Sequence, residues 1–245
     1  MSTRHPAFWK IFFIILGVVT VGIICLFIAF FIFYSWQFKF GTRQKITEIT
    51  QKFEEKFSSI SDDTGAPDPV VQPELFIHEN NPTYGTADAP ITIISFSDFE
   101  CPYSQEQQEV ISYLMTTYQP VIRIVFKHMP LESIHEHAQS AALTSMCANE
   151  QGKFWEYADI LFKTKQLDDT SLFNSAGQIG VDIQKFNTCF TNKTFKKVID
   201  QDLLDSQTLK LRGTPTNIVN GEVIEGVKTK EQWDEIIVKH LNNAK

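Results

Sequence analysis

The sequence predicts an α/β domain that follows a long apolar segment near the N-terminus. Residues 91–97 and 121–127 are rich in β-branched side chains, and residues 104–118 between them are suited to a helix. Strand, helix and strand in this order form a βαβ unit with parallel strands and a right-handed crossover. Before this unit, residues 11–38 form a run of 28 residues without a charge.

The uncharged run is long enough to span a membrane, because about 20 apolar residues cross the hydrocarbon core as a helix. Aromatic residues stand at both ends of the run, as in the interfacial belts of membrane proteins: Trp9, Tyr34 and Trp36. A cleaved signal peptide is the alternative, but its apolar region has roughly 7–15 residues and ends in a small-x-small site. We therefore expect a short N-terminal tail (residues 1–10) and a transmembrane helix at residues 11–36 in contact with lipid.

Charge is divided unequally along the chain. Residues 1–45 carry five Lys and Arg and no acidic residue, whereas the other 200 residues have a net charge of −12. The overall charge of −7 and the acidic pI argue against a nucleic-acid-binding domain. More basic residues follow the apolar run than precede it, so the positive-inside rule does not place the N-terminus in the cytoplasm. Because large C-terminal domains can translocate despite such charges, we expect a single-pass protein whose C-terminal domain is extracytoplasmic.

Residues 37–83 are expected to form an amphipathic stalk and a linker. Apolar residues recur at spacings of 3, 4, 4 and 3 within residues 42–61: Ile46, Ile49, Phe53, Phe57 and Ile60. This pattern is typical of a helical stalk, and a dimerising coiled coil is an alternative, although about two heptads is short for one. Residues 62–73 contain Pro, Gly and Asp and are expected to be a linker.

The remaining elements complete a small sheet around a large helical region. Residues 134–211 are mostly suited to helices. Two short strands are predicted at 216–219 and 222–225, joined by a tight turn at Asn220-Gly221. A last helix is predicted at about residues 230–241.

Cys101 lies where the first strand of the βαβ unit gives way to its helix. At a helix N-terminus, free amide groups and the helix dipole favour the thiolate, which is the nucleophile in disulfide exchange. The neighbouring carboxylates of Asp98 and Glu100 act in the opposite direction. An inert, half-buried thiol is the alternative. No pair of the four cysteines has C-x-x-C spacing, which excludes a zinc knuckle of that type.

The residues around Cys101 resemble the active-site segment of DsbA-like thioredoxin-fold proteins. Residues 96–104, Phe-Ser-Asp-Phe-Glu-Cys-Pro-Tyr-Ser, are similar to that family's F-x-D-F-x-C-P-Y-C pattern. Further segments are similar in the same order: 127–131, 135–142, 151–155, 213–216, Asn220-Gly221 and Gly226. The resemblance covers residues 84–245 and implies a thioredoxin-like fold with a helical insertion after the βαβ unit.

The resemblance also implies which residues form the site. Cys101 is the expected nucleophile. Thr214-Pro215 resembles the loop whose proline is cis and faces the active cysteine, and whose backbone binds an extended substrate segment. The residues expected to bind substrate are therefore Pro102, Tyr103, Thr214 and Pro215.

Two positions depart from the family pattern. Ser104 stands where the family has its second active-site cysteine, and Ser95 stands where it has a buried acid that is thought to help proton transfer. Without a resolving thiol, Cys101 would form a mixed disulfide that only another thiol can release. Ser104 remains a catalytic candidate, because its hydroxyl can donate a hydrogen bond to the thiolate.

The leading hypothesis is a membrane-anchored thiol–disulfide exchange protein, an isomerase or monothiol oxidoreductase, that acts through Cys101. Its partners would be protein thiols and disulfides of the cell envelope and an external thiol reductant. The alternative is a peptide-binding or partner-binding module that has lost dithiol activity, as Ser95 and Ser104 suggest. A third hypothesis is a peroxidase-like use of Cys101 through a sulfenic acid.

The other cysteines and the histidines suggest structural roles. The resemblance suggests a structural disulfide between Cys147 and Cys189 in the helical insert, and two buried thiols are the alternative. Cys25 lies in the apolar segment and is expected to pack as a small apolar residue. Three histidines raise the question of a metal site, namely His128, His135 and His137, but their spacing does not fit one. Neither a metal nor another cofactor is expected.

Overall fold

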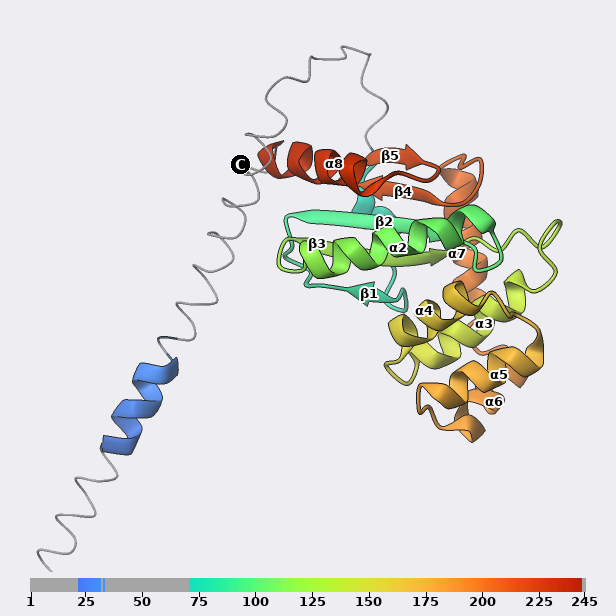
Figure 1. Ribbon diagram of the computed structural model, residues 1–245, viewed down its shortest axis with the longest axis horizontal. Coiled ribbons are helices and arrows are strands. Elements are labelled where there is room, and N and C mark those ends of the chain that lie inside the picture. The colour runs from blue at the N-terminus through green and yellow to red at the C-terminus, as the bar shows by residue number, and fades with distance from the viewer. Residues whose placement is uncertain (1–21, 32, 34–70, 244–245) are drawn as a thin grey trace, which may run out of the picture. The chain divides into compact units, whose positions relative to one another are not determined.

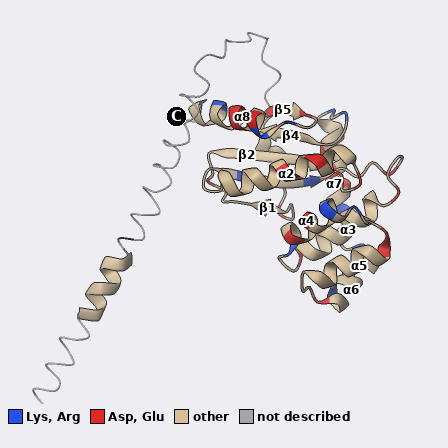
Figure 2. Cartoon of the chain, viewed as in Figure 1, with Lys and Arg blue, Asp and Glu red and all other residues tan. Residues whose placement is uncertain are grey.

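The computed structural model describes residues 22–31, 33 and 71–243. Residues 22–31 are helical, exposed and free of charged side chains (Figure 2). Within these described ranges, no helix has the length and hydropathy needed to cross a bilayer. Most of the proposed transmembrane helix at 11–36, the tail at 1–10 and the stalk helix at 42–61 lie outside the described residues, so these remain predictions.

A five-stranded sheet forms the centre of the C-terminal domain, with strand order β1-β3-β2-β4-β5 (Figure 1). Its strands are β1 (Thr83–Tyr84), β2 (Ile91–Ser97), β3 (Ile122–His128), β4 (Thr216–Val219) and β5 (Glu222–Glu225). β2 and β3 are parallel and are connected by α2 (Pro102–Thr117), whereas the other pairs are antiparallel. The predicted βαβ unit is therefore confirmed.

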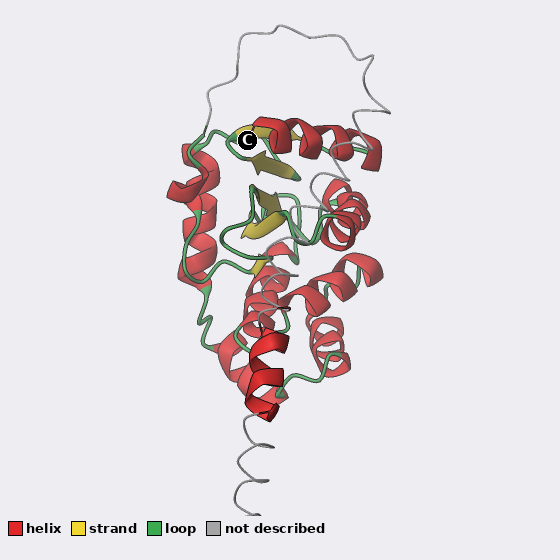
Figure 3. Ribbon diagram, turned by 90° about the vertical axis from the view of Figure 1, so that its left-hand side faces the viewer, coloured by secondary structure: helices red, strands yellow, loops and turns green. Residues whose placement is uncertain are grey.

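Helices cover both faces of the sheet, as the view along the strands shows (Figure 3). On one face lie α2 and α8 (Lys230–Asn243), which are joined by hydrogen bonds from the hydroxyls of Tyr113 and Tyr118 to the Asp234 carboxylate. The other face is covered by α7 (Lys196–Thr208) and the short 3₁₀ helix η1 (Pro73–Phe76). Alternation along β2 sends Phe96 to this second face and Ser95 to the first.

The helical insert consists of α3 (Ala138–Asn149), α4 (Phe154–Thr164), α5 (Asp169–Gln178) and α6 (Ile183–Thr191), and α7 leads back to the sheet. Figure 1 shows these four helices grouped together, away from the β4–β5 hairpin. They share a core built largely from aromatic and aliphatic side chains, including Phe154, Tyr157, Leu161 and Phe186. A disulfide joins Cys147 of α3 to Cys189 of α6, with their Cα atoms 5.8 Å apart, which is the pairing that the resemblance suggested.

The folded domain includes residues 71–83, which the sequence analysis placed in the stalk and linker. The Val71 N–H donates a hydrogen bond to the Gly221 carbonyl at 2.9 Å, and Phe76 packs against the apolar cluster on the α7 face of the sheet. Asn81 is buried and donates a hydrogen bond to Asp202 of α7. The boundary at residue 84 was therefore too late, because this segment supplies partners for groups that are distant in sequence.

A buried ionic cluster joins this segment to β3 and α7. The Lys127 ammonium lies 2.8 Å from Asp202 Oδ1, contacts Asp205, and donates a hydrogen bond to the Phe76 carbonyl. Burial raises the pKa of Asp202, although the charge of Lys127 opposes this shift. Burial also acts to raise the pKa of Asp205, but hydrogen bonds, chiefly from Lys127, outweigh it and lower that pKa. One ammonium group thus compensates two carboxylates inside the protein.

Candidate active site

Cys101 lies at the N-cap position of α2, directly after the loop that follows β2. Its backbone is extended (φ −68°, ψ 121°), and Pro102 then begins the helix, where a missing N–H costs no intrahelical hydrogen bond. The Cys101 N–H donates to the Asp98 carbonyl at 3.2 Å, and its own carbonyl accepts from the Gln105 N–H at 3.0 Å. Its exposed fraction is 5%, so the thiol is nearly buried at the end of a helix.

The loop that contains Thr214 and Pro215 faces Cys101. The Thr214-Pro215 peptide bond is cis, and Cys101 Sγ lies 3.3 Å from the Thr214 carbonyl oxygen. Pairing of β4 with β2 brings this loop to the nucleophile, because Thr216 lies opposite Phe96. Among the described residues, nothing accepts a hydrogen bond from the Thr214 N–H, so this donor is unpaired within them.

Ser104 and Ser95 line a small cavity beneath the start of α2. Ser104 is 2% exposed, and its Oγ accepts a hydrogen bond from the Asp98 N–H at 3.4 Å. The cavity has room for about one water molecule. Gln107 also lines it, and the Gln107 Nε2 atom has no hydrogen-bond partner within the described residues. A hydroxyl therefore occupies the position of a second thiol, and the cavity is lined by uncharged groups.

The carboxylates of Asp98 and Glu100 are bound by the loop before α3. Asp98 accepts hydrogen bonds from the backbone N–H groups of Glu100 and Leu131, and its Oδ2 lies 2.7 Å from His135 Nδ1. Glu100 accepts from the His137 N–H at 2.7 Å. The sequence analysis treated His135 only as a possible metal ligand and missed this pairing. The similarity of residues 135–142 to a family helix start was its one available signal.

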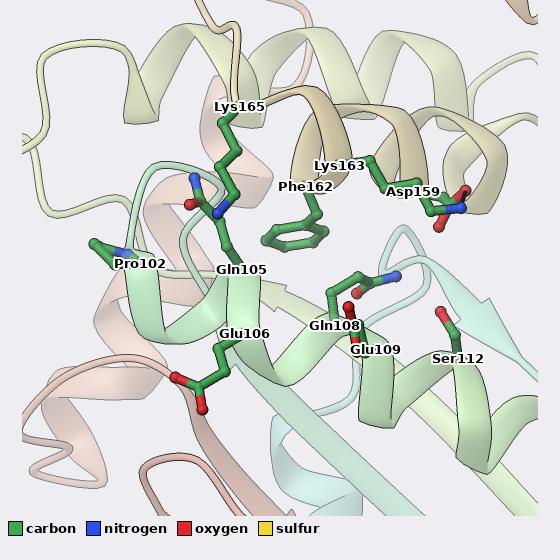
Figure 4. A pocket seen from close by; sticks show the side chains of 10 residues that line it. All are labelled: Pro102, Gln105, Glu106, Gln108, Glu109, Ser112, Asp159, Phe162, Lys163 and Lys165. Atoms are coloured by element: carbon green, nitrogen blue, oxygen red, sulfur yellow. Dashed lines mark hydrogen bonds and ion pairs between the residues drawn. The ribbon is translucent and has the colours of Figure 1, made fainter.

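Pro102 and Tyr103 are exposed on the outer side of the site, and Tyr103 has an exposed fraction of 63%. Beside Pro102, a groove of about 630 Å³ runs between α2 and α4. Figure 4 shows Phe162 pointing from α4 toward α2, with Lys165 reaching toward Gln105. The expected substrate-binding residues therefore lie in two places, with Pro102 and Tyr103 outside and Thr214 and Pro215 across from the thiol.

His128 is fully buried at the end of β3. Burial and the positive charge of Lys127 lower the pKa of His128 to about 3, so its ring is neutral at neutral pH. Its ring packs against Phe99, Phe126 and Phe154. Within the ranges that the structure describes, no three His, Cys, Asp or Glu side chains are arranged to hold a metal ion.

Comparison with known proteins places this arrangement in a family. A family model described as thioredoxin matches residues 78–239, which is most of the chain. The chain belongs to the thioredoxin family. The match begins before residue 84 and so includes Asn81, which donates a hydrogen bond to Asp202 of α7 in this thioredoxin domain.

The curated relatives are much longer proteins. The domain is 34% identical over 162 residues to Na(+)/H(+) antiporter NhaA 3 of Salinispora tropica, covering 66% of this chain and 25% of that protein. It is 33% identical over 138 residues to Na(+)/H(+) antiporter NhaA 1 of Salinispora arenicola, covering 56% of this chain and 21% of that protein. This chain therefore spans about a quarter or less of the curated relatives that it matches.

Solved structures share the fold of the thioredoxin domain at low sequence identity. A thioredoxin-like oxidoreductase from Silicibacter pomeroyi has a TM-score of 0.64 and 23% identity, covering 71% of this chain and 99% of that one. Oxidised BdbD from Bacillus subtilis has a TM-score of 0.60 and 21% identity, covering 74% and 100%. The thiol-disulfide exchange protein alpha-DsbA2 from Wolbachia pipientis has a TM-score of 0.59 and 17% identity, covering 81% and 96%. These likenesses concern the fold.

Proposed function

We propose that the domain performs thiol–disulfide exchange on protein substrates, with Cys101 as its single nucleophile. The observation that carries this proposal is the position of Cys101 Sγ at the N-terminus of α2, 3.3 Å from the carbonyl of a residue that precedes a cis-proline. The helix N-terminus favours the thiolate, and the Thr214 N–H can hold a substrate strand beside it. Two of the fold neighbours are named as oxidoreductase and thiol-disulfide exchange protein, which agrees with this chemistry.

In the proposed first step, the Cys101 thiolate attacks one sulfur of a substrate disulfide. A new bond forms between Cys101 and that sulfur, while the second substrate sulfur leaves as a thiolate and takes up a proton. Ser104 has no thiol that could attack the mixed disulfide between Cys101 and the substrate, so release of the substrate requires another thiolate. When a further cysteine of the substrate supplies it, the substrate disulfide is rearranged without net oxidation. When a small external thiol supplies it, the substrate leaves joined to that thiol and Cys101 is regenerated.

We also propose that residues 11–36 hold the domain at a membrane, with the domain outside the cytoplasm. The uncharged run of 28 residues supports an anchor. The Cys147–Cys189 disulfide supports an oxidising compartment, where such bonds persist. The names of the curated relatives, Na(+)/H(+) antiporters, agree with a domain of this kind being kept at a membrane.

A peptide-binding module without turnover is the second candidate. The Thr214 N–H favours it, because strand addition at this backbone needs no thiol. The replacement of the second cysteine by Ser104 favours it too. In this case Cys101 would be dispensable for partner binding.

Trapping of mixed disulfides separates the two candidates. The full chain, in its membrane, is exposed to envelope proteins, free thiols are blocked with N-ethylmaleimide, and mass spectrometry identifies proteins attached to Cys101. The exchange proposal expects adducts that disappear on reduction and are missing in Cys101→Ala, whereas Cys25→Ala, the matched control, keeps them. Partner capture that is equal in wild type and Cys101→Ala would support the binding module instead.

A further inference from the structure

The side chain of Asp98 is buried only three positions before the nucleophile. Its Oδ1 accepts a hydrogen bond from the Glu100 N–H at 2.8 Å, and its Oδ2 accepts one from the Leu131 N–H at 2.9 Å. His135 Nδ1 lies 2.7 Å from the same Oδ2. A buried carboxylate is costly unless its lone pairs are satisfied, and here partners from two loops satisfy it.

These bonds fasten the loop between β3 and α3 to the loop that carries Cys101. Leu131 and His135 bind Asp98, and the His137 N–H donates to Glu100. Because the Cys101 N–H donates in turn to the Asp98 carbonyl, the place of the nucleophile depends on how Asp98 is held. The start of the helical insert is thereby coupled to the active site.

Among the described residues, His135 is the group in contact with Asp98 that can carry a positive charge. Arg212, in the loop between α7 and β4, is exposed and forms an ion pair with Glu225. Lys127 forms ion pairs with Asp202 and Asp205 on the α7 face of the sheet. Glu100 adds a second negative charge on the same loop, and its partner is an uncharged backbone N–H.

We propose that His135 is a positioning residue for Cys101: it holds the Asp98 carboxylate and so fixes the loop whose Asp98 carbonyl accepts a hydrogen bond from the Cys101 N–H. This proposal rests on the exchange function proposed above and assigns a regulator of its nucleophile. The helix N-terminus favours the Cys101 thiolate only while the thiol is held at that position, so loosening the loop of Asp98 weakens this effect. Loss of His135 should therefore reduce the reactivity of Cys101 even when no substrate is present.

The test is the rate at which iodoacetamide alkylates Cys101 in the full chain between about pH 5 and about pH 9, read at this residue by mass spectrometry. His135→Ala should slow alkylation at neutral pH by about threefold to tenfold and shift the rate profile to higher pH. His135→Asn, which keeps a donor at the Nδ1 position but has no charge, should lie between this variant and wild type. His137→Ala is the matched control and should behave as wild type, because His137 contributes its backbone N–H.

A second substitution tests whether the effect of His135 passes through Asp98. In the double variant Asp98→Asn/His135→Ala, the buried carboxylate that would be left without its His135 partner is gone, so the profile should return toward that of wild type. The proposal is overturned if His135→Ala matches His137→Ala, or if the double variant is as slow as His135→Ala. Alkylation of Cys101 requires no substrate disulfide. Failure of mixed-disulfide trapping would therefore refute the proposed exchange function, whereas the alkylation rates would still test the role of His135. His135→Asn provides the comparison if His135→Ala does not fold.

Discussion

The Nζ atom of Lys127 lies 2.8 Å from Oδ1 of Asp202, and neither side chain is exposed to solvent. Removing one partner of a buried ion pair leaves an uncompensated charge in the protein interior. We therefore expect Lys127→Met to lower the free energy of unfolding by about 3–5 kcal/mol, measured by chemical denaturation at neutral pH. Lys196→Met is the control, because the Lys196–Asp200 pair is half exposed and its loss should cost less than about 1 kcal/mol. Equal costs for the two variants would contradict a stabilising role of the buried pair.

Ser104→Cys should restore a resolving thiol in the first turn of α2. The new thiol would attack the mixed disulfide at Cys101 intramolecularly and release the substrate. We expect trapped adducts to fall by on the order of tenfold or more relative to wild type, because the attack no longer depends on an external thiol. Ser104→Ala, which removes the hydroxyl without adding a thiol, should keep the adducts. If Ser104→Cys retains as many adducts as Ser104→Ala, release by a resolving thiol is not what limits their lifetime.

The disulfide between Cys147 and Cys189 closes a loop with a sequence separation of 42 residues. A disulfide that closes a loop of this length strongly restricts the conformations of the unfolded chain. Cys147→Ala/Cys189→Ala should therefore lower the free energy of unfolding by about 2–4 kcal/mol. Reducing agent should destabilise the wild type by a similar amount and leave the double variant unchanged. Cys25→Ala, which removes a thiol outside this bond, serves as the control. A wild type whose denaturation curve ignores reductant would count against a stabilising disulfide.

Acid should destabilise the domain through His128. Its pKa in the folded protein is lowered to about 3 by burial and by Lys127, whereas the pKa of an unfolded histidine is about 6.5. Between these values the unfolded chain binds a proton that the folded protein does not. The free energy of unfolding should therefore be unaffected by His128 above about pH 6.5 and fall below it, by up to about 1.4 kcal/mol per pH unit.

His128→Phe isolates this contribution. Phenylalanine suits the aromatic surroundings of Phe99, Phe126 and Phe154 and takes up no proton. Between about pH 6 and about pH 4, the variant should lose stability less steeply than wild type, by about 1 kcal/mol per pH unit. Denaturation curves across this range provide the measurement, with His137→Ala as a half-exposed histidine control. Parallel pH profiles for wild type and His128→Phe would show that His128 does not titrate on unfolding.

The elements around the nucleophile were predictable because their signals are local. The strand at residues 91–97 has the bounds of β2, and the Asn220-Gly221 turn is present with positive φ at both residues, 46° and 97°, as a tight hairpin of this type requires. The N-cap position of Cys101 followed from a strand that gives way to Pro102. Each of these features depends on residues that are close together in the sequence, so the local amino-acid pattern is enough to predict it.

The contacts that hold the site in place were not predictable from local patterns. Lys127 lies in a strand, and the alternation of side chains along that strand does not predict its ion pairs with two aspartates more than 70 positions later. The same holds for Asn81, whose burial against Asp202 makes residues 71–83 part of the domain. His135 stood in a polar segment with no periodic signal, and its partner Asp98 lies 37 positions earlier. Pairings of this kind arise from the sheet topology, which brings the ends of β2 and β3 together.

The hydrogen bond from Val71 to Gly221 has a mechanical consequence. A pull on the chain before Val71, such as the proposed membrane anchor would exert, would act first on this bond to the β4–β5 turn and then on the hydrogen bond from Lys127 to the Phe76 carbonyl. Both lie on segments other than the loop of Asp98 and Cys101. Tension on the proposed membrane anchor would therefore act on the β4–β5 turn and the buried ionic cluster before it reached the loop of Cys101.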